Sequence, residues 1–133
     1  MKRTGVSLLF FAVATFVVAE AQNFTGEYAD RNFLGGQATF QMSLEQSGKA
    51  VSVWFSAGYN DGHGIQPVAD GRGRISGKGT VEFTFNDSSH NAGTGTITRV
   101  GDDIIVSLKA TRVADPGCLE LYRQNMRLKR VKK

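Results

Sequence analysis

Apolar and polar residues alternate along most of the chain, and this period of two restricts its fold more than any other feature. In a β-strand successive side chains point to opposite faces, so such alternation indicates strands with one buried face. The pattern is clear in four segments, 38–45, 51–57, 81–86 and 104–110. Weaker alternation extends the expected set to eight strands by adding 24–29, 68–76, 93–100 and 125–131.

The connections between these segments are short and rich in turn residues. None is long enough for a crossover helix, which predicts an antiparallel order of consecutive strands. Eight such strands close into an up-and-down β-barrel, an arrangement that removes exposed sheet edges. A two-sheet β-sandwich is the alternative fold. A single turn of helix is expected within 115–123, after the turn residues Asp115-Pro116-Gly117.

In an up-and-down barrel successive connections alternate between the two ends, so their lengths predict which end is open. One end receives the tight connections 46–49, 76–79 and 100–103. The other receives the long connections 30–36, 58–66, 87–92 and 111–124. Binding residues concentrate in long loops on a rigid scaffold, so the long-loop end is the candidate mouth. A hairpin at Asp70-Gly71 would reassign the later loops.

The leading functional hypothesis is a non-enzymatic barrel that binds a small, partly apolar molecule at this mouth. Apolar side chains of the inward stripe would line the interior, and polar loop residues would surround the entrance. The candidate ligand-binding residues are Phe40, Val53, Phe83, Val106, Tyr59, Asp61, His63, Asp87 and His90. The hypothesis requires a ligand-sized interior cavity.

A protein-binding module, such as an inhibitor of an extracytoplasmic enzyme, is the alternative function. Trp54 lies on the opposite face of its strand from Val53 and Phe55, and it would be a credible contact if exposed. A metal-dependent enzyme would require His63 and His90 to converge. Neither loop has a recognised metal-ligand spacing, and no catalytic or phosphate-loop motif is complete, so no metal, cofactor or catalytic residue is expected.

The first 21 residues have the features of a cleavable signal peptide. Lys2 and Arg3 precede an apolar stretch over 6–18, and Ala19-Glu20-Ala21 supplies the small-x-small cleavage pattern. The stretch is shorter than the roughly 20 residues of a membrane-spanning helix. A periplasmic or secreted domain over 22–133, without a membrane span, is therefore expected. A small-molecule ligand or an extracytoplasmic protein is its expected partner.

Two further features bear on partners. Cys118 is the only cysteine, so it is a small buried apolar residue, the link of a disulfide-bonded dimer or a reactive thiol. The chain has a formal net charge of +4, and its basic residues gather in 123–133. Export and the lack of interleaved aromatic residues argue against nucleic acid. A contact with anionic lipid or an acidic protein stays open, beside a simply solvated strand.

Short motifs at both ends of the domain resemble the calycin arrangement of lipocalins and avidins. Gly26-Glu27-Tyr28 opens the first expected strand, and Arg127 and Arg130 lie in the last. The resemblance implies that Tyr28 takes the place of the lipocalin tryptophan, with Arg127 or Arg130 packed over its ring. On this interpretation Gly26, Tyr28 and Arg127 close the barrel and do not bind ligand.

Overall fold

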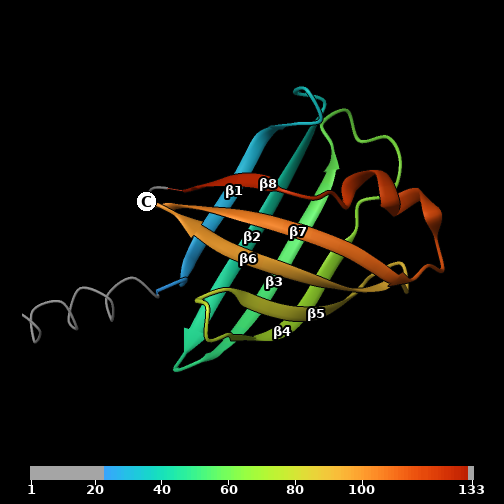
Figure 1. Cartoon of the computed structure of the whole chain (residues 1–133). Coiled ribbons are helices and arrows are strands. Elements are labelled where there is room, and N and C mark those ends of the chain that lie inside the picture. The colour runs from blue at the N-terminus through green and yellow to red at the C-terminus, as the bar shows by residue number, and fades with distance from the viewer. Residues whose placement is uncertain (1–22, 132–133) are drawn as a thin grey trace, which may run out of the picture.

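The computed structural model describes residues 23–131, which form an all-β closed barrel of eight antiparallel strands (Figure 1). Each strand pairs with the next, and β8 pairs with β1. The strands are β1 (Gly26–Phe33), β2 (Ala38–Ser47), β3 (Ala50–Tyr59), β4 (Val68–Ile75), β5 (Val81–Asp87), β6 (Ala92–Val100), β7 (Asp103–Arg112) and β8 (Met126–Arg130). The predicted barrel is confirmed, and the β-sandwich is not formed. The proposed signal peptide lies outside the described residues.

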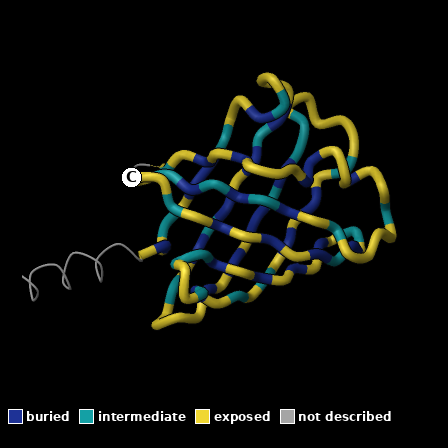
Figure 2. Tube along the Cα trace, viewed as in Figure 1, coloured by how far each residue is buried: buried dark blue, intermediate teal, exposed yellow. Residues whose placement is uncertain are grey.

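Alternation of the side chains builds the core as the sequence pattern predicts. Along β5, Val81, Phe83 and Phe85 are buried, and the intervening side chains are exposed. Buried and exposed positions alternate in the same way around the barrel (Figure 2). Aromatic rings continue this core across the interior, with ring contacts from β2 through Phe55 of β3 to Phe85 of β5.

Four inward-facing glycines flank the two phenylalanines of β5. Gly71 and Gly93 lie opposite Phe85, and Gly73 and Gly95 lie opposite Phe83. A Cβ atom added at any of these glycines would come within 2.4 Å of backbone or ring atoms. The Phe rings therefore occupy the space that glycine leaves. This packing explains the weak alternation of β4, which continues through Asp70-Gly71 without a hairpin.

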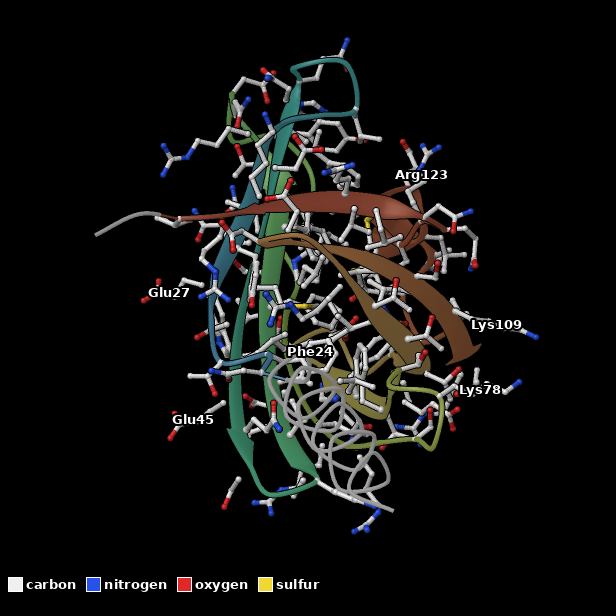
Figure 3. The ribbon with its side chains drawn as sticks, turned by 60° about the vertical axis from the view of Figure 1, so that its left-hand side comes forward. Phe24, Glu27, Glu45, Lys78, Lys109 and Arg123 are labelled. Atoms are coloured by element: carbon white, nitrogen blue, oxygen red, sulfur yellow. The ribbon has the colours of Figure 1, made fainter. Side chains whose placement is uncertain are left out.

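The connections sort between the two ends of the barrel as predicted (Figure 1). Their lengths differ less than expected, because 34–37 and 88–91 at the expected mouth are no longer than 76–80 at the other end, and only 60–67 and 113–125 are long. Both ends are closed by side chains. A 3-10 helix, η1 (Pro116–Leu121), lies at the long-loop end, and its Cys118 and Leu121 are buried in the core together with Tyr122. Phe24 is buried at the tight-turn end, between the strands in Figure 3, whereas Glu27 and Glu45 point away.

The seam between β1 and β8 contains the motif that resembles the calycins. Tyr28 is buried, and its hydroxyl donates to the Phe24 carbonyl at 2.7 Å. Arg130, not Arg127, lies over the Tyr28 ring, with its Cζ 5.0 Å from the ring centroid, and donates to the hydroxyl. A Cβ on Gly26 would lie 2.4 Å from the Arg130 guanidinium, so this guanidinium could not keep its position over Tyr28 beside a larger residue.

The closing role expected of Arg127 is therefore corrected. Arg127 occupies the other phase of β8, where its exposed side chain forms a salt bridge with Asp103. Alternation explains the difference, because Arg130 shares the inward phase of Met126 and Leu128.

Candidate functional site

The four side chains predicted to line a cavity are buried parts of one continuous core. Phe40 stacks on Phe55 at a centroid distance of 5.4 Å, and Phe55 meets Phe85 at 5.0 Å. Val53, Phe83 and Val106 belong to the same cluster. Tyr122 completes the packing from the long-loop end, because its ring contacts both Phe55 and Phe85. The expected open mouth is thus occupied by the protein's own residues.

Asp87, predicted as a mouth residue, lies at the buried end of β5. Its Oδ1 accepts the backbone N–H groups of Ser89 and Asn91, and its Oδ2 accepts the Asn91 amide and the Tyr122 hydroxyl. The fully buried Asn91 in turn accepts the N–H groups of Ala114 and Asp115. The network attaches η1 and its leading loop to the barrel, so Asp87 has a structural role.

The charge of Asp87 is maintained by these hydrogen bonds. Burial alone would raise its pKa, but the donors from Tyr122, Asn91 and Ser89 outweigh this effect and hold the pKa of Asp87 below its ordinary value. Burial and the adjacent carboxylate raise the pKa of Tyr122 well above its usual range. Tyr122 therefore remains a protonated donor to an ionised Asp87, which is the arrangement that a strong charge-assisted hydrogen bond requires.

His90 lies in the exposed turn between β5 and β6. Its φ is 67°, a left-handed conformation that favours glycine. Its backbone N–H donates to the Asp87 carbonyl at 3.2 Å. His90 therefore contributes to the turn through the conformation and the hydrogen bond of its backbone.

Replacing His90 with glycine should leave the barrel intact and raise the free energy of unfolding by roughly 0.5 kcal/mol, because glycine adopts positive φ without steric cost. Urea unfolding of the two proteins measures the difference. A clear loss of stability would show that the imidazole ring makes a contact that the turn needs.

Tyr59, Asp61 and His63 lie in or beside the long β3–β4 loop. The His63 ring stacks on Tyr59 at 4.2 Å, and its Nδ1 is 2.5 Å from Asp61 Oδ1. The N–H of His63 lowers the pKa of Asp61. The Tyr59 hydroxyl donates to Glu120 at 3.0 Å, which raises the pKa of Tyr59. These contacts join the loop to η1 at the surface. Across residues 23–131, no three His, Cys, Asp or Glu side chains gather in the manner of a metal site.

A dimer linked through Cys118, which the sequence leaves open, is not supported. Cys118 lies on the buried side of η1 with no exposed surface, and burial raises the pKa of its thiol. Both effects suppress disulfide formation, because the reacting species is an accessible thiolate. Cys118 thus has the alternative role considered from the sequence, that of a small buried apolar residue.

The outer surface of the barrel carries an exposed tryptophan. Trp54 projects from the middle of β3 between Ser43 of β2 and Asp70 of β4, and 38% of its surface is exposed. Val68, 43% exposed, follows on the same side of β4. We call the outer surface of β2, β3 and β4 around Trp54 the Trp54 face. Within residues 23–131 it combines an exposed indole with hydrogen-bonding neighbours.

Two hollows flank Trp54, because the residues beside it on β3 are Ser52 and Ser56. The first, of about 350 Å³, is also lined by Thr39, Gln41, Asn60 and Gln66. The second, of about 430 Å³, is also lined by Ser43, Glu45, Asp70 and Arg72. The indole therefore lies between two depressions, of which the first has a mixed polar and apolar lining and the second a mainly polar one.

Comparison of the chain with protein-family models, with curated proteins and with solved structures gives no match. The function is therefore inferred from the geometry of the described residues. The sequence predicts the Trp54 face as an alternative to the mouth. The small residues Ser52 and Ser56 on either side of Trp54 are the sequence signal that the indole is not covered by its neighbours on β3. The Asn91 and Tyr122 contacts were not foreseen, because they depend on how η1 packs.

Proposed function

We propose that this protein is a non-enzymatic binding module that engages an extracytoplasmic protein through the Trp54 face. The observation that carries the proposal is the exposed indole of Trp54 on the rigid wall of the barrel. Tryptophan is enriched among the residues that dominate binding energy at protein interfaces. Holding so large an apolar side chain in water is unfavourable, and a partner that covers it removes this cost.

The packed interior supports an outer site over an internal one. A ligand between Phe40, Phe55 and Phe85 would have to displace rings that are already in contact. Entry from the long-loop end would also require η1 to leave its network with Asp87. We therefore place the binding function outside the barrel, and the small apolar ligand first expected is not part of the proposal.

The chemistry of the Trp54 face favours a protein partner. Its centre is apolar, with Trp54 and Val68, and its surroundings are polar, which is the usual organisation of a protein interface. Glu45, Asp70 and Arg72 place charges of both signs on one side of the indole. A partner with complementary charges there would bind in one orientation.

The setting of this function is part of the proposal. Residues 1–21 have the pattern of a secretion signal, and we infer that the barrel works in a periplasm or outside the cell. The Gly26, Tyr28 and Arg130 contacts also support a calycin-type closure of the barrel. Neither inference alters the position of the binding face.

The test uses site-specific crosslinking followed by affinity measurement. A photoreactive phenylalanine at Ser52 should crosslink one discrete protein in the extracytoplasmic fraction of the source cells. The same probe at Thr96, on the outer face of β6, is the control. With the purified partner, Trp54→Ala should raise Kd by roughly a hundredfold, in keeping with an interface hot spot. Thermal unfolding should be nearly unchanged, because the indole lies outside the core.

Trp54 is also the only tryptophan, so its fluorescence reports the contact directly. Emission of the free protein should be that of a solvated indole, readily quenched by acrylamide. Partner binding should shift it to shorter wavelength and protect it from quenching. A partner that binds Trp54→Ala with undiminished affinity, or that crosslinks equally from Thr96, would contradict the proposal.

A further inference from the structure

The pairing of β1 with β8, which closes the barrel, covers only part of the length of β1. The two strands pair at Tyr28 with Arg130 and at Ala29 with Lys129. In β1 the register then shifts between Asp30 and Phe33, and the paired segment of β8 continues along β7. A cavity of about 450 Å³ lies where the strands separate. Its open side is on the outer surface of the barrel.

Basic side chains dominate the lining of this cavity. Arg31 comes from β1, and Arg127, Lys129 and Arg130 come from β8. Arg31, Arg127 and Lys129 face outward. Ala29 of β1 pairs with Lys129 and has only a methyl side chain, so it leaves space at the base of the cavity. Cations from two strands therefore converge on one concave surface that has a small residue at its base.

Two of the arginines are held in place by contacts that leave part of each guanidinium free. Asp103 Oδ2 binds Nε and Nη2 of Arg127, both at 3.1 Å. Arg130 donates through Nη1 to the Thr25 carbonyl and through Nη2 to Tyr28. Preorganised guanidinium groups lose less conformational entropy when an anion binds than free ones do.

The carboxylates at this site do not neutralise it. Asp30 lines the cavity and offsets one of its positive charges, while its Oδ1 accepts the backbone N–H of Asn32 at 2.9 Å. Asp103 offsets Arg127. Within residues 23–131, neither Arg31 nor Lys129 forms a salt bridge. The residues that line the cavity carry four positive charges, and Asp30 in the lining and Asp103 beside Arg127 offset two of them, so an excess of two positive charges remains, which favours a dianion.

We propose that the seam cavity binds the phosphate group of a phosphomonoester. The phosphate dianion matches the excess charge, and its oxygens accept the planar donors of arginine and the ammonium of lysine. The volume exceeds that of a phosphate group alone, so part of the attached molecule also enters the cavity. The site goes beyond the protein-binding function proposed for the Trp54 face and uses different side chains.

The phosphate group has two possible sources, a soluble phosphomonoester and a phosphomonoester lipid headgroup. Phenyl phosphate represents the first in calorimetric titrations. Phosphatidylcholine vesicles with and without phosphatidic acid represent the second in a flotation assay. Binding in either arm supports the proposal, and the arm in which binding occurs identifies the source.

The decisive variant is Arg127→Gln with Lys129→Gln, which removes two exposed cations from the seam. We expect it to weaken binding by about a hundredfold, since each lost charge-assisted hydrogen bond costs roughly 1.5 kcal/mol or more. Lys78→Gln is the matched control, because Lys78 is an exposed lysine in the β4–β5 turn, on the opposite side of Figure 3 from Glu27 of β1. It should bind as tightly as the wild type.

Thermal unfolding establishes that each variant is folded. If the double variant unfolds, Arg31→Gln provides the same test from β1, where the side chain is exposed. Absence of binding to both probes would overturn the proposal. An equal loss in Lys78→Gln would also overturn it, because a general electrostatic attraction would then explain the binding.

Discussion

Gly73→Ala should strongly destabilise the barrel, and Gly77→Ala should leave its stability nearly unchanged. A Cβ at Gly73 would lie 2.4 Å from the Glu82 carbonyl oxygen and 2.9 Å from Phe83 Cα. Both are backbone atoms of the paired strand β5, so the clash is relieved only if the two strands separate. We expect the loss to exceed about 3 kcal/mol, a large part of a small domain's stability. A Cβ at Gly77 meets nothing within 4 Å.

Circular dichroism and urea unfolding measure this effect, and Gly95 provides an internal comparison. A Cβ at Gly95 would contact the Phe83 ring at 2.4 Å, a side chain that is replaceable. Phe83→Leu should therefore partly restore Gly95→Ala and should not restore Gly73→Ala. Unfolding of Gly73→Ala within a few degrees of the wild type would show that β4 and β5 separate at little cost.

Asp87→Asn should lower the free energy of unfolding at neutral pH by roughly 3 kcal/mol. Asp87 receives four hydrogen bonds, and both of its oxygens accept two. An asparagine has one acceptor oxygen, and its amide would face the donors of Asn91 and Tyr122. Leaving buried donors without an acceptor costs about 1–3 kcal/mol each, and more when a charge is involved.

The same substitution should flatten the acid branch of the stability curve. The pKa of Asp87 is lower in the folded protein than its ordinary value of 3.8. Its ionised form therefore contributes stability above pH 3.8, and this contribution disappears as the pH falls through the folded pKa. Unfolding free energies measured from neutral pH downward should fall less steeply for Asp87→Asn. The exposed Asp70→Asn is the control, and equal slopes in wild type and Asp87→Asn would contradict the assignment.

The barrel was predictable from the sequence because each buried stripe follows the period of a strand. The number of strands, their order and the sorting of the connections between the ends all follow from that period. Asp70-Gly71 was ambiguous because glycine is both a turn residue and a residue without a side chain. Its actual role depends on Phe85 of the neighbouring strand, a contact that no local pattern contains.

The candidate site was less predictable because its residues depend on packing between distant segments. Asp87 was assigned to the solvated mouth from its turn-like surroundings. The alternation along β5 was the better guide, because it places Asp87 on the same inward face as Val81, Phe83 and Phe85 and so predicts that it is buried. Phase also separates Arg130 from Arg127. No comparable signal exists for the position of η1, because its attachment requires Asn91, Tyr122 and Asp87 to meet in the folded barrel.

The β1–β8 seam has a consequence for the order in which the chain acquires its structure. The hydrogen bond between Arg130 and Tyr28 joins residues 102 positions apart. Contacts of such long range form slowly, because closing a large loop costs entropy before any packing is gained. Until residues 126–130 are available to pair with β1 and β7, strands β1–β7 form at most an open sheet with two unpaired edges. For a chain exported as we propose, the barrel would be completed only after residues 126–130 have crossed the membrane.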